Sequence, residues 1–412
     1  MKRKVVITGM GVVTPIGTGV DKYWQNLIEG KSGIARITLF DPDNMETKIA
    51  GEVKDFDPLQ YMEKSEARRI DRFSQFAFAA SDEAIKHSGL DLEKIDRFRI
   101  GVIVGSGIGG LQTLINQHKI YLEKGIKRVS PFLIPMMIPN MASGLVSIKY
   151  KLNGPNMCVV SACASAAHSI GESFRYIQRG DADVMLSGGA EAPIVELGVA
   201  GFINMRALSS RNDEPQKASR PFDQDRDGFV IGEGAAMLVL ESEDHALARG
   251  AEIYAYVAGY GTSADAYHIA APQESGDGAL RCMRNALDDA GITIDQVEYI
   301  NAHGTATPAG DRAEVNAIRK LFGEKADGLK ISSNKSMIGH LLGAAGGVEA
   351  VSTILSLCHG IIPPTINLDT PEFQLDFVPH KHERAGVNVA LSNSFGFGGH
   401  NATLVLAKYE EK

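Results

Sequence analysis

The sequence predicts an α/β protein in which two halves, each with the same order of elements, form one layered fold. Short apolar runs typical of strands alternate with amphipathic stretches along the whole chain. The order of strand, helix of small residues and glycine-containing hairpin occurs once before Gly250 and once after it. We therefore expect an internal duplication with halves at residues 1–250 and 251–412. Two independent α/β domains are the alternative.

The first half begins with the segment MKRKVVITGMGVVTPIG, whose basic start and apolar run superficially resemble a signal peptide. The run is short, broken by glycine and rich in β-branched residues, so it predicts a buried strand. Arg72–His87 is expected to be a helix and Arg99–Val104 a strand. The strand-like run Cys158–Cys163 leads into a helix over Ala164–Arg179, and a hairpin-like pair around Phe229–Glu241 closes this half.

The second half repeats this order. Asp277–Ala290 has apolar residues at helical spacing, and Val297–Ala302 has the pattern of a strand. The short strand Lys330–Asn334 leads into a second helix of small residues, about Gly343–Leu357. Val387–Lys408 then closes the half as a glycine-containing hairpin.

Composition limits the function classes. A charged fraction of 22% and a formal net charge of −8 argue against bulk binding of nucleic acid or anionic membranes, and leave room only for a local basic patch. Four scattered cysteines without a C-x-x-C pair argue against a disulfide framework and a structural zinc site. We find no apolar run of membrane-spanning length, and we expect the reducing cytoplasm.

One glycine motif suggests a different function. Gly105, Gly107 and Gly110 match G-x-G-x-x-G after a strand, which is the dinucleotide-binding fingerprint. The fingerprint requires a second strand that ends in an acidic residue about 20 positions later. Here the segment after Leu111–Lys124 is basic and rich in proline, so a nicotinamide or flavin oxidoreductase is the weaker alternative.

A second motif resembles a calcium loop. Asp223, Asp225, Asp227 and Gly228 begin like an EF-hand. The bidentate glutamate should then stand at the position that Gly234 occupies, and the flanking segments do not have helical patterns. We therefore reject a calcium site.

Cys163 is the candidate nucleophile. It lies between a strand-like run and a helix of small residues. The positive end of a helix dipole favours the thiolate, and the free N–H groups there can hold an oxyanion. The alternative, a buried small apolar residue, is the better interpretation of Cys158, Cys282 and Cys358.

Two histidines lie in comparable contexts. His303 follows an expected strand directly, and His340 lies between a strand and the second helix of small residues. Strand ends are where ligands of α/β sheets bind. Lys335 and Glu349 flank His340, and a buried pair of this kind could orient an imidazole; an exposed ion pair is the alternative.

Several motifs in order now carry a family resemblance. They are GSGIGGL at 105–111, SACASA around Cys163, RPFDQDRDGFVIGEGA at 220–235, HGTATPAGD around His303, NKSMIGHLLGAAGGVEA around His340 and NSFGFGGHN near the end. End to end, the chain resembles the β-ketoacyl-[acyl carrier protein] synthases, and most of all the type II synthase of dissociated fatty-acid synthesis. The resemblance implies the thiolase-like fold, with duplicated halves in α-β-α-β-α layers.

The resemblance also implies a ping-pong reaction without a cofactor, because phosphopantetheine arrives on the carrier protein. Cys163 would take the acyl chain from acyl carrier protein and then pass it to decarboxylated malonyl carrier protein. The backbone N–H groups of Cys163 and Phe397 would hold the oxyanion. His303 and His340 would stabilise the enolate, supported by Lys335 and Glu349.

Substrate contacts follow from the same resemblance. Thr305 and Thr307 would bind the phosphopantetheine arm, Ile108 and Phe202 would line the acyl tunnel, and Ile108 would move aside for longer chains. Phe397 would gate the entrance on a glycine-flanked loop that includes Gly398.

The chain departs from the family pattern at a few positions. Ala270 and Ala271 stand where many members have threonine or serine, so hydroxyl contacts from there are in doubt. His400 replaces a common threonine and Ala166 a common glycine, and neither change removes a catalytic group.

Partners and ions are implied in the same way. The family is typically homodimeric and often holds a structural monovalent cation. The matching cation positions are Asn301, Ala302, Glu349, Ser392 and Asn393. An acidic carrier protein requires a basic docking face, for which the candidates are Lys64, Arg68, Arg69, Lys127, Arg128 and Arg206.

Rival functions remain at this point. A thiolase or an initiating ketoacyl synthase would resemble a Cys-His-Cys or Cys-His-Asn arrangement, whereas this chain offers two histidines. The non-catalytic chain-length partner of polyketide synthases lacks the cysteine that is present here as Cys163. The sequence does not distinguish a fatty-acid pathway from a polyketide pathway, nor does it fix the preferred acyl length.

Overall fold

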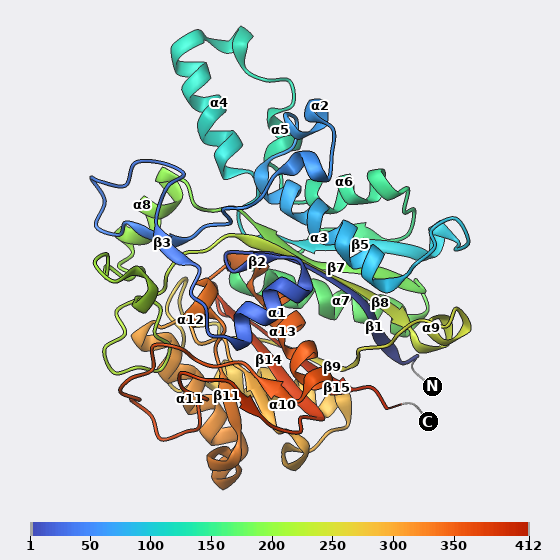
Figure 1. The fold of residues 1–412 in the computed structure, drawn as a ribbon, viewed down its shortest axis with the longest axis vertical. Helices are drawn as coiled ribbons and strands as arrows, with labels where there is room; N and C mark the ends of the chain where they lie inside the picture. Colours follow the sequence, from blue (N-terminus) through green and yellow to red (C-terminus); the bar gives the residue numbers. More distant parts are fainter. Residues whose placement is uncertain (1–2, 411–412) are drawn as a thin grey trace.

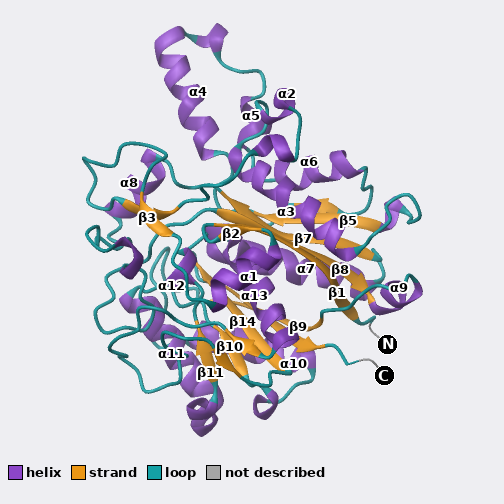
Figure 2. Ribbon diagram, in the orientation of Figure 1, coloured by secondary structure: helices purple, strands orange, loops and turns teal. Residues whose placement is uncertain are grey.

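The computed structural model describes residues 3–410 and shows two similar halves built on one continuous sheet of eleven strands (Figures 1 and 2). The strand order is β11-β10-β14-β15-β9-β1-β8-β7-β5-β6, and β2 pairs with β1 off this path. The bounds in the first half are β1 (Val5–Thr14), β2 (Gly17–Thr18), β5 (Ile100–Gly105), β6 (Asn156–Met157), β7 (Val184–Glu191) and β8 (Gly234–Ser242). Those in the second half are β9 (Ala255–Ala264), β10 (Tyr299–Asn301), β11 (Lys330–Ser332), β14 (Val389–Gly396) and β15 (His400–Lys408).

The two halves have the same strand topology. In the first half β5 is parallel to β6 and β7, and β7, β8 and β1 follow antiparallel. In the second half β10 is parallel to β11 and β14, and β14, β15 and β9 follow antiparallel. Three antiparallel residue pairs between β1 and β9 join the two halves of the sheet. The repeated order confirms the thiolase-like α/β fold.

Helices form three layers around the two halves of the sheet (Figure 1). The helices α7 (Ser165–Arg179) and α13 (Ala345–His359) pack between the halves, with α7 on β5 and β7 and α13 on β14 and β15. On the outer faces, α3 (Arg72–Ser88) covers β1 and β8, and α10 (Asp277–Ala290) covers β9 and β15. Three separate apolar clusters fill the spaces between these layers.

The structure has further helices and two small sheets besides these elements. The helices are α1 (Val20–Ile28), α2 (Lys64–Ala67), α4 (Leu111–Lys124), α5 (Leu133–Met137), α6 (Met141–Tyr150), α8 (Glu196–Asn204), α9 (Glu243–Ala248), α11 (Pro308–Phe322) and α12 (Lys335–Ile338). Two small sheets pair β3 (Ile34–Arg36) with β4 (Ile49–Gly51), and β12 (Ile361–Ile362) with β13 (Glu383–Arg384).

The two central helices begin in the same way. A 3₁₀ turn over Ala162–Ala164 precedes α7, and a 3₁₀ turn over Leu342–Ala344 precedes α13. The first residue of each turn has a left-handed backbone, with φ of 50° at Ala162 and 46° at Leu342. This conformation is strained for a residue with a side chain, and such strain concentrates at functional sites.

Two expectations about local structure were wrong. Cys158–Cys163 is not a strand, because the paired residues of β6 are Asn156–Met157 and the chain then turns into the 3₁₀ helix. The expected hairpin around Phe229–Glu241 does not form: Gly234–Ser242 is a single strand, β8, that pairs with β7 and β1, while Phe229 and Ile231 make only isolated bridges to other segments. Val160 in the first segment is 56% exposed, so a short apolar run marks neither a strand nor a buried position by itself.

One described helix has the length and hydropathy of a membrane span, contrary to the expectation that no run would. It covers Leu342–His359, has a mean hydropathy of 1.2 and is 89% buried inside the protein. Its position between the two halves of the sheet explains the apolar composition.

Candidate active site

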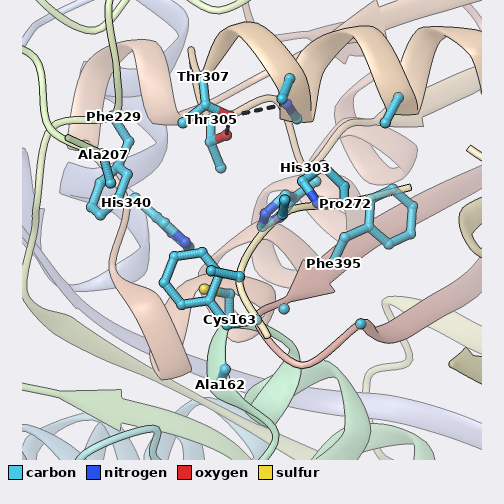
Figure 3. Close-up of a pocket in the computed structure, with 18 of the residues that line it drawn as sticks. Ala162, Cys163, Ala207, Phe229, Pro272, His303, Thr305, Thr307, His340 and Phe395 are labelled. Carbon is cyan, nitrogen blue, oxygen red and sulfur yellow. Dashed lines mark hydrogen bonds between the residues drawn. The ribbon is translucent and has the colours of Figure 1, made fainter. Parts of the chain in front are cut away.

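Cys163, His303 and His340 line one cavity of about 600 Å³ (Figure 3). Cys163 comes from the turn before α7, His303 from the loop after β10, and His340 from the segment between α12 and α13. The two imidazoles point into the space above the Cys163 sulfur in Figure 3. The structure therefore brings together side chains from both halves of the chain.

The Cys163 sulfur is buried against the loop after β14. The backbone N–H of Phe397 donates a hydrogen bond to the sulfur. Burial nevertheless raises the pKa of the Cys163 thiol to about 12, although Lys335 and this hydrogen bond oppose the rise. The thiolate that we expected from the helix terminus is therefore not the resting form, because removal from water outweighs the favourable groups.

The two histidines are neutral donors at physiological pH. Their ring centroids are 5.4 Å apart and the rings are nearly perpendicular, at 87°. Burial, together with the charge of Lys335, lowers the pKa of both imidazoles well below the ordinary value. A neutral imidazole has one N–H to donate toward a developing negative charge.

Lys335 and Glu349 form a buried ion pair, each about 1% exposed. The Lys335 ammonium also donates to the backbone carbonyl of His303 at 2.6 Å. The support for the histidines that we expected therefore acts on the His303 main chain, where Lys335 holds the loop that carries the imidazole. The positive charge also disfavours protonation of both rings.

Glu314 is a site residue that sequence analysis missed. It lies on α11, is 1% exposed and lines the cavity. Its carboxylate accepts the backbone N–H groups of His303 at 2.9 Å and Gly304 at 2.8 Å. The missed signal is a pair of carboxylates, Asp311 and Glu314, at helical i, i+3 spacing directly after the His303 motif.

The residues expected to form an acyl tunnel line the cavity, and the tunnel itself stays a prediction. Ile108, Phe202 and Phe397 all line the cavity. The Phe202 ring lies 6.4 Å from that of Phe397, and the Phe229 ring packs edge-on against His340 at 5.4 Å. A linear apolar chain is the group that such a lining accommodates.

Thr305 and Thr307 place two hydroxyls, 3.0 Å apart, on the lining of the cavity. Ala270 and Ala271 also line the cavity, so this part of the wall presents methyl groups. Gly398 has a left-handed backbone with φ of 82°, and its N–H donates to the Ile269 carbonyl at 2.8 Å, which connects the Phe397 loop to the mouth of the cavity.

All six docking candidates have exposed side chains, in three groups. Lys64, Arg68 and Arg69 lie in or directly after α2, and Lys127 and Arg128 lie in the 3₁₀ turn after α4. Arg206 follows α8 and lines the cavity. The function of these residues stays a prediction.

The positions proposed for a cation are buried together. Asn301 on β10 pairs in register with Ser392 on β14. Among the described residues, Asn301 Oδ1 and Glu349 Oε2 are buried oxygens without a hydrogen-bond partner. Buried oxygens without a partner are the kind of ligand that a cation would satisfy, whereas the Asn393 oxygen already accepts from Thr403 at 2.9 Å, and the cation stays a prediction.

Comparison with known families agrees with this geometry. The profile described as "Beta-ketoacyl synthase, N-terminal domain" matches residues 2–246, and "Beta-ketoacyl synthase, C-terminal domain" matches residues 254–369. The chain belongs to the β-ketoacyl synthase family. It is therefore a condensing enzyme, and the three side chains in the cavity have the types and positions that the family motifs imply.

Relatives of this synthase match it along its whole length. The chain is 52% identical to "3-oxoacyl-[acyl-carrier-protein] synthase 2" of Synechocystis sp. over 411 residues, covering 99% of both chains. Similar relatives with the same name occur in Staphylococcus aureus strain COL, at 52% identity and 99% of both chains, and in Vibrio harveyi, at 51% and 100% of both.

Solved structures resemble the synthase equally completely. A β-ketoacyl synthase from Burkholderia phymatum STM815 has a TM-score of 0.93 at 37% identity, covering 100% of both chains. A type II polyketide ketosynthase in complex with its acyl carrier protein has a TM-score of 0.91 at 33% identity, also over 100% of both.

Proposed function

We propose that the protein catalyses the decarboxylative condensation of an acyl group, held on Cys163, with malonyl carrier protein to give 3-oxoacyl carrier protein and carbon dioxide. The observation that carries this proposal is the single cavity that joins Cys163, His303 and His340. The names of the relatives, at about 52% identity over the whole chain, support fatty-acid elongation as the pathway.

In the first half-reaction the Cys163 sulfur attacks the thioester of acyl carrier protein. The acyl–sulfur bond to phosphopantetheine breaks, and the thiol proton of Cys163 ends on the departing pantetheine sulfur. The N–H of Phe397, which already donates to Sγ, and that of Cys163 at the start of α7 stabilise the oxyanion.

In the second half-reaction malonyl carrier protein loses carbon dioxide, and the electron pair remains on the thioester as an enolate. His303 and His340 donate hydrogen bonds to the enolate oxygen as neutral imidazoles. The enolate carbon attacks the acyl carbonyl on Cys163, a carbon–carbon bond forms and the bond to the sulfur breaks. Solvent then returns a proton to the cysteine.

The experiment that tests this function uses purified carrier proteins. Acyl carrier protein and radiolabelled malonyl carrier protein should give 3-oxoacyl product and carbon dioxide in equal amounts. Cys163→Ala should abolish condensation, because no acyl group can be held. An intact Cys163→Ala variant that condenses at the wild-type rate would refute the role of the sulfur.

A polyketide ketosynthase is the alternative, since one structural relative is titled as a type II polyketide ketosynthase at 33% identity and another as a ketosynthase/chain length factor at 36%. The greater identity to the fatty-acid synthases favours elongation. The non-catalytic chain-length partner is disfavoured because Cys163 is present in the cavity.

The family resemblance supports further parts of this proposal: a homodimer, a cytoplasmic location and no cofactor beyond the carrier-borne phosphopantetheine. All four cysteines are free, which suits a reducing compartment. Leu122 near the end of α4 and Ile126 in the turn after it are exposed apolar residues. A second copy of the chain would cover them. Sedimentation showing only monomer at micromolar concentration would refute the dimer.

A structural monovalent cation completes the proposal. Asn301 and Glu349 would hold it through the oxygens that have no partner among the described residues. The cation would neutralise buried negative charge near the Lys335 pair and supply no step of the reaction. Equal thermal stability in potassium chloride and choline chloride would count against it.

A further inference from the structure

Glu191, the last residue of β7, is a fully buried carboxylate with no part in the reaction described above. It accepts four hydrogen bonds. Oε1 accepts from the Ser106 hydroxyl at 2.8 Å and the Ile108 N–H at 3.1 Å. Oε2 accepts from the Gly107 N–H at 2.6 Å and the Gly343 N–H at 2.9 Å. The carboxylate therefore joins the loop after β5 to the turn before α13.

The glycines around this carboxylate are required by its position. A Cβ on Gly107 would lie 2.9 Å from Glu191 Oε2, and a Cβ on Gly343 would lie 2.5 Å from the same atom. The G-x-G-x-x-G motif at 105–110 thus contributes N–H groups that hold a carboxylate of the protein itself. Consecutive N–H groups of this kind form an anion-binding concavity, and here the anion is internal.

The loop that Glu191 holds carries a wall of the acyl site. The Ile108 side chain lines the cavity beside Cys163 and Phe202, while its N–H is bound to Glu191. The bond fixes the Ile108 backbone and leaves its side chain as the movable part. The Ile108 side chain, which packs in the same apolar cluster as Cys163 and Phe202, then contributes to the cavity from a main chain that Glu191 holds.

We propose that Glu191 is a positioning residue that sets acyl-length selectivity by fixing the backbone of the loop that carries Ile108. This inference rests on the proposed condensing function. It assigns a role to the 105–110 glycine motif, which neither the nucleophile nor the two histidines use.

Glu191→Gln tests the proposal. A glutamine has one acceptor oxygen, so in either orientation two of the four donors face an NH₂ group. We expect the loop to loosen and the ratio of kcat/KM for long over short acyl primers to shift by about fivefold or more. The ratio cancels any general loss of active enzyme. An unchanged ratio in folded Glu191→Gln would overturn the proposal.

A matched control is available in Glu241→Gln. Glu241 is also fully buried, but it pairs with Val184 at the opposite end of the β7–β8 ladder, where Arg249 and His245 bind it. We expect this variant to lose stability while the selectivity ratio stays as in the wild type. An equal shift in both variants would show a general effect of buried carboxylates and overturn the assignment to Glu191.

Two further measurements separate failure of this inference from failure of the proposed function. If Glu191→Gln does not fold, Ser106→Ala removes one of the four donors and should shift the same ratio in the same direction. Hydrogen exchange at residues 105–110 needs no activity. It should be faster in whichever variant folds than in the wild type, and unchanged exchange would overturn the proposal even if the enzyme failed to condense any substrate.

Discussion

At the residue scale, burial determines the protonation states in the cavity. Cys163 and the two histidines are all enclosed, so each is held in its uncharged form. A neutral thiol protects the sulfur from oxidation and unwanted alkylation before substrate arrives, since the thiolate is the reactive species. Charge then develops only during the reaction, where N–H groups are already in place to meet it.

The raised pKa of Cys163 predicts a distinctive alkylation profile. The folded pKa of about 12 lies above the ordinary thiol value, so the thiolate fraction should rise about tenfold per pH unit from pH 7 to 10. The rate of iodoacetamide modification, followed by mass spectrometry at Cys163, should rise in parallel. A rate that is constant above pH 7 would show that the sulfur is already ionised at rest.

The lowered pKa of His303 and His340 predicts how the decarboxylation rate depends on pH below neutrality. Because the folded pKa lies below the usual 6.5, the neutral form that donates to the enolate persists as pH falls through 6.5. Decarboxylation of malonyl carrier protein at saturation should therefore show no loss of kcat between pH 8 and 6.5. A loss at pH 6.5 of about twofold, if one imidazole must be neutral, or about fourfold, if both must, would indicate unperturbed histidines.

At the element scale, periodicity identified helices well, and apolar runs such as Arg99–Val104 and Val387–Lys408 contain the expected strands, with one exception. The helix over Asp277–Ala290 was predicted with the observed bounds, and Arg72–His87 was one residue short. Cys158–Cys163 was wrongly taken as a strand, because a short apolar run has the same composition in an irregular segment as in a strand.

The sequence predicted part of the candidate site and missed another part. The three side chains that meet in the cavity follow from motifs at strand and helix ends. Glu191 was missed because it binds backbone N–H groups of distant loops, which no local pattern shows, whereas Glu314 had a local signal in its spacing from Asp311 that was overlooked. The protonation state of Cys163 was also missed, since it depends on enclosure by both halves of the chain.

Close contact between β5 and α7 gives an element-scale prediction. A Cβ on Gly105 would lie 2.5 Å from the backbone of Ser165, on the helix that follows Cys163. Gly105→Ala should lower the free energy of unfolding by about 1–3 kcal/mol or more, measured by urea titration. The control is Gly201→Ala on α8, where nothing lies within 4 Å of the added Cβ and stability should stay equal or rise slightly. Equal stability of the two variants would contradict this packing.

At the scale of the whole molecule, duplication explains why the active site lies where it does. The turn before α7 contacts β14 of the other half, the turn before α13 contacts β7, and the two turns contact each other. One turn supplies Cys163 and the other follows His340. A site built this way needs both halves, so neither should condense substrate alone.

The charge of the whole molecule leads to the last prediction. The net charge of −8 opposes an acidic carrier protein, so productive encounters require local positive charge. Arg68→Glu should raise KM for acyl carrier protein several-fold and leave kcat near the wild-type value. Arg69 is a less specific position for this test, because its guanidinium also lies 4.8 Å from the Phe132 ring centre.

The control for Arg68 is Arg284→Glu, an exposed arginine on α10 in the outer layer of the second half. It makes the same change in net charge, and KM should stay at the wild-type value. Because salt screens charges on exposed surfaces, the difference between the two variants should shrink as ionic strength rises. Equal KM values for both variants at low salt would show that the carrier protein senses only net charge, and the docking face would then have to lie elsewhere.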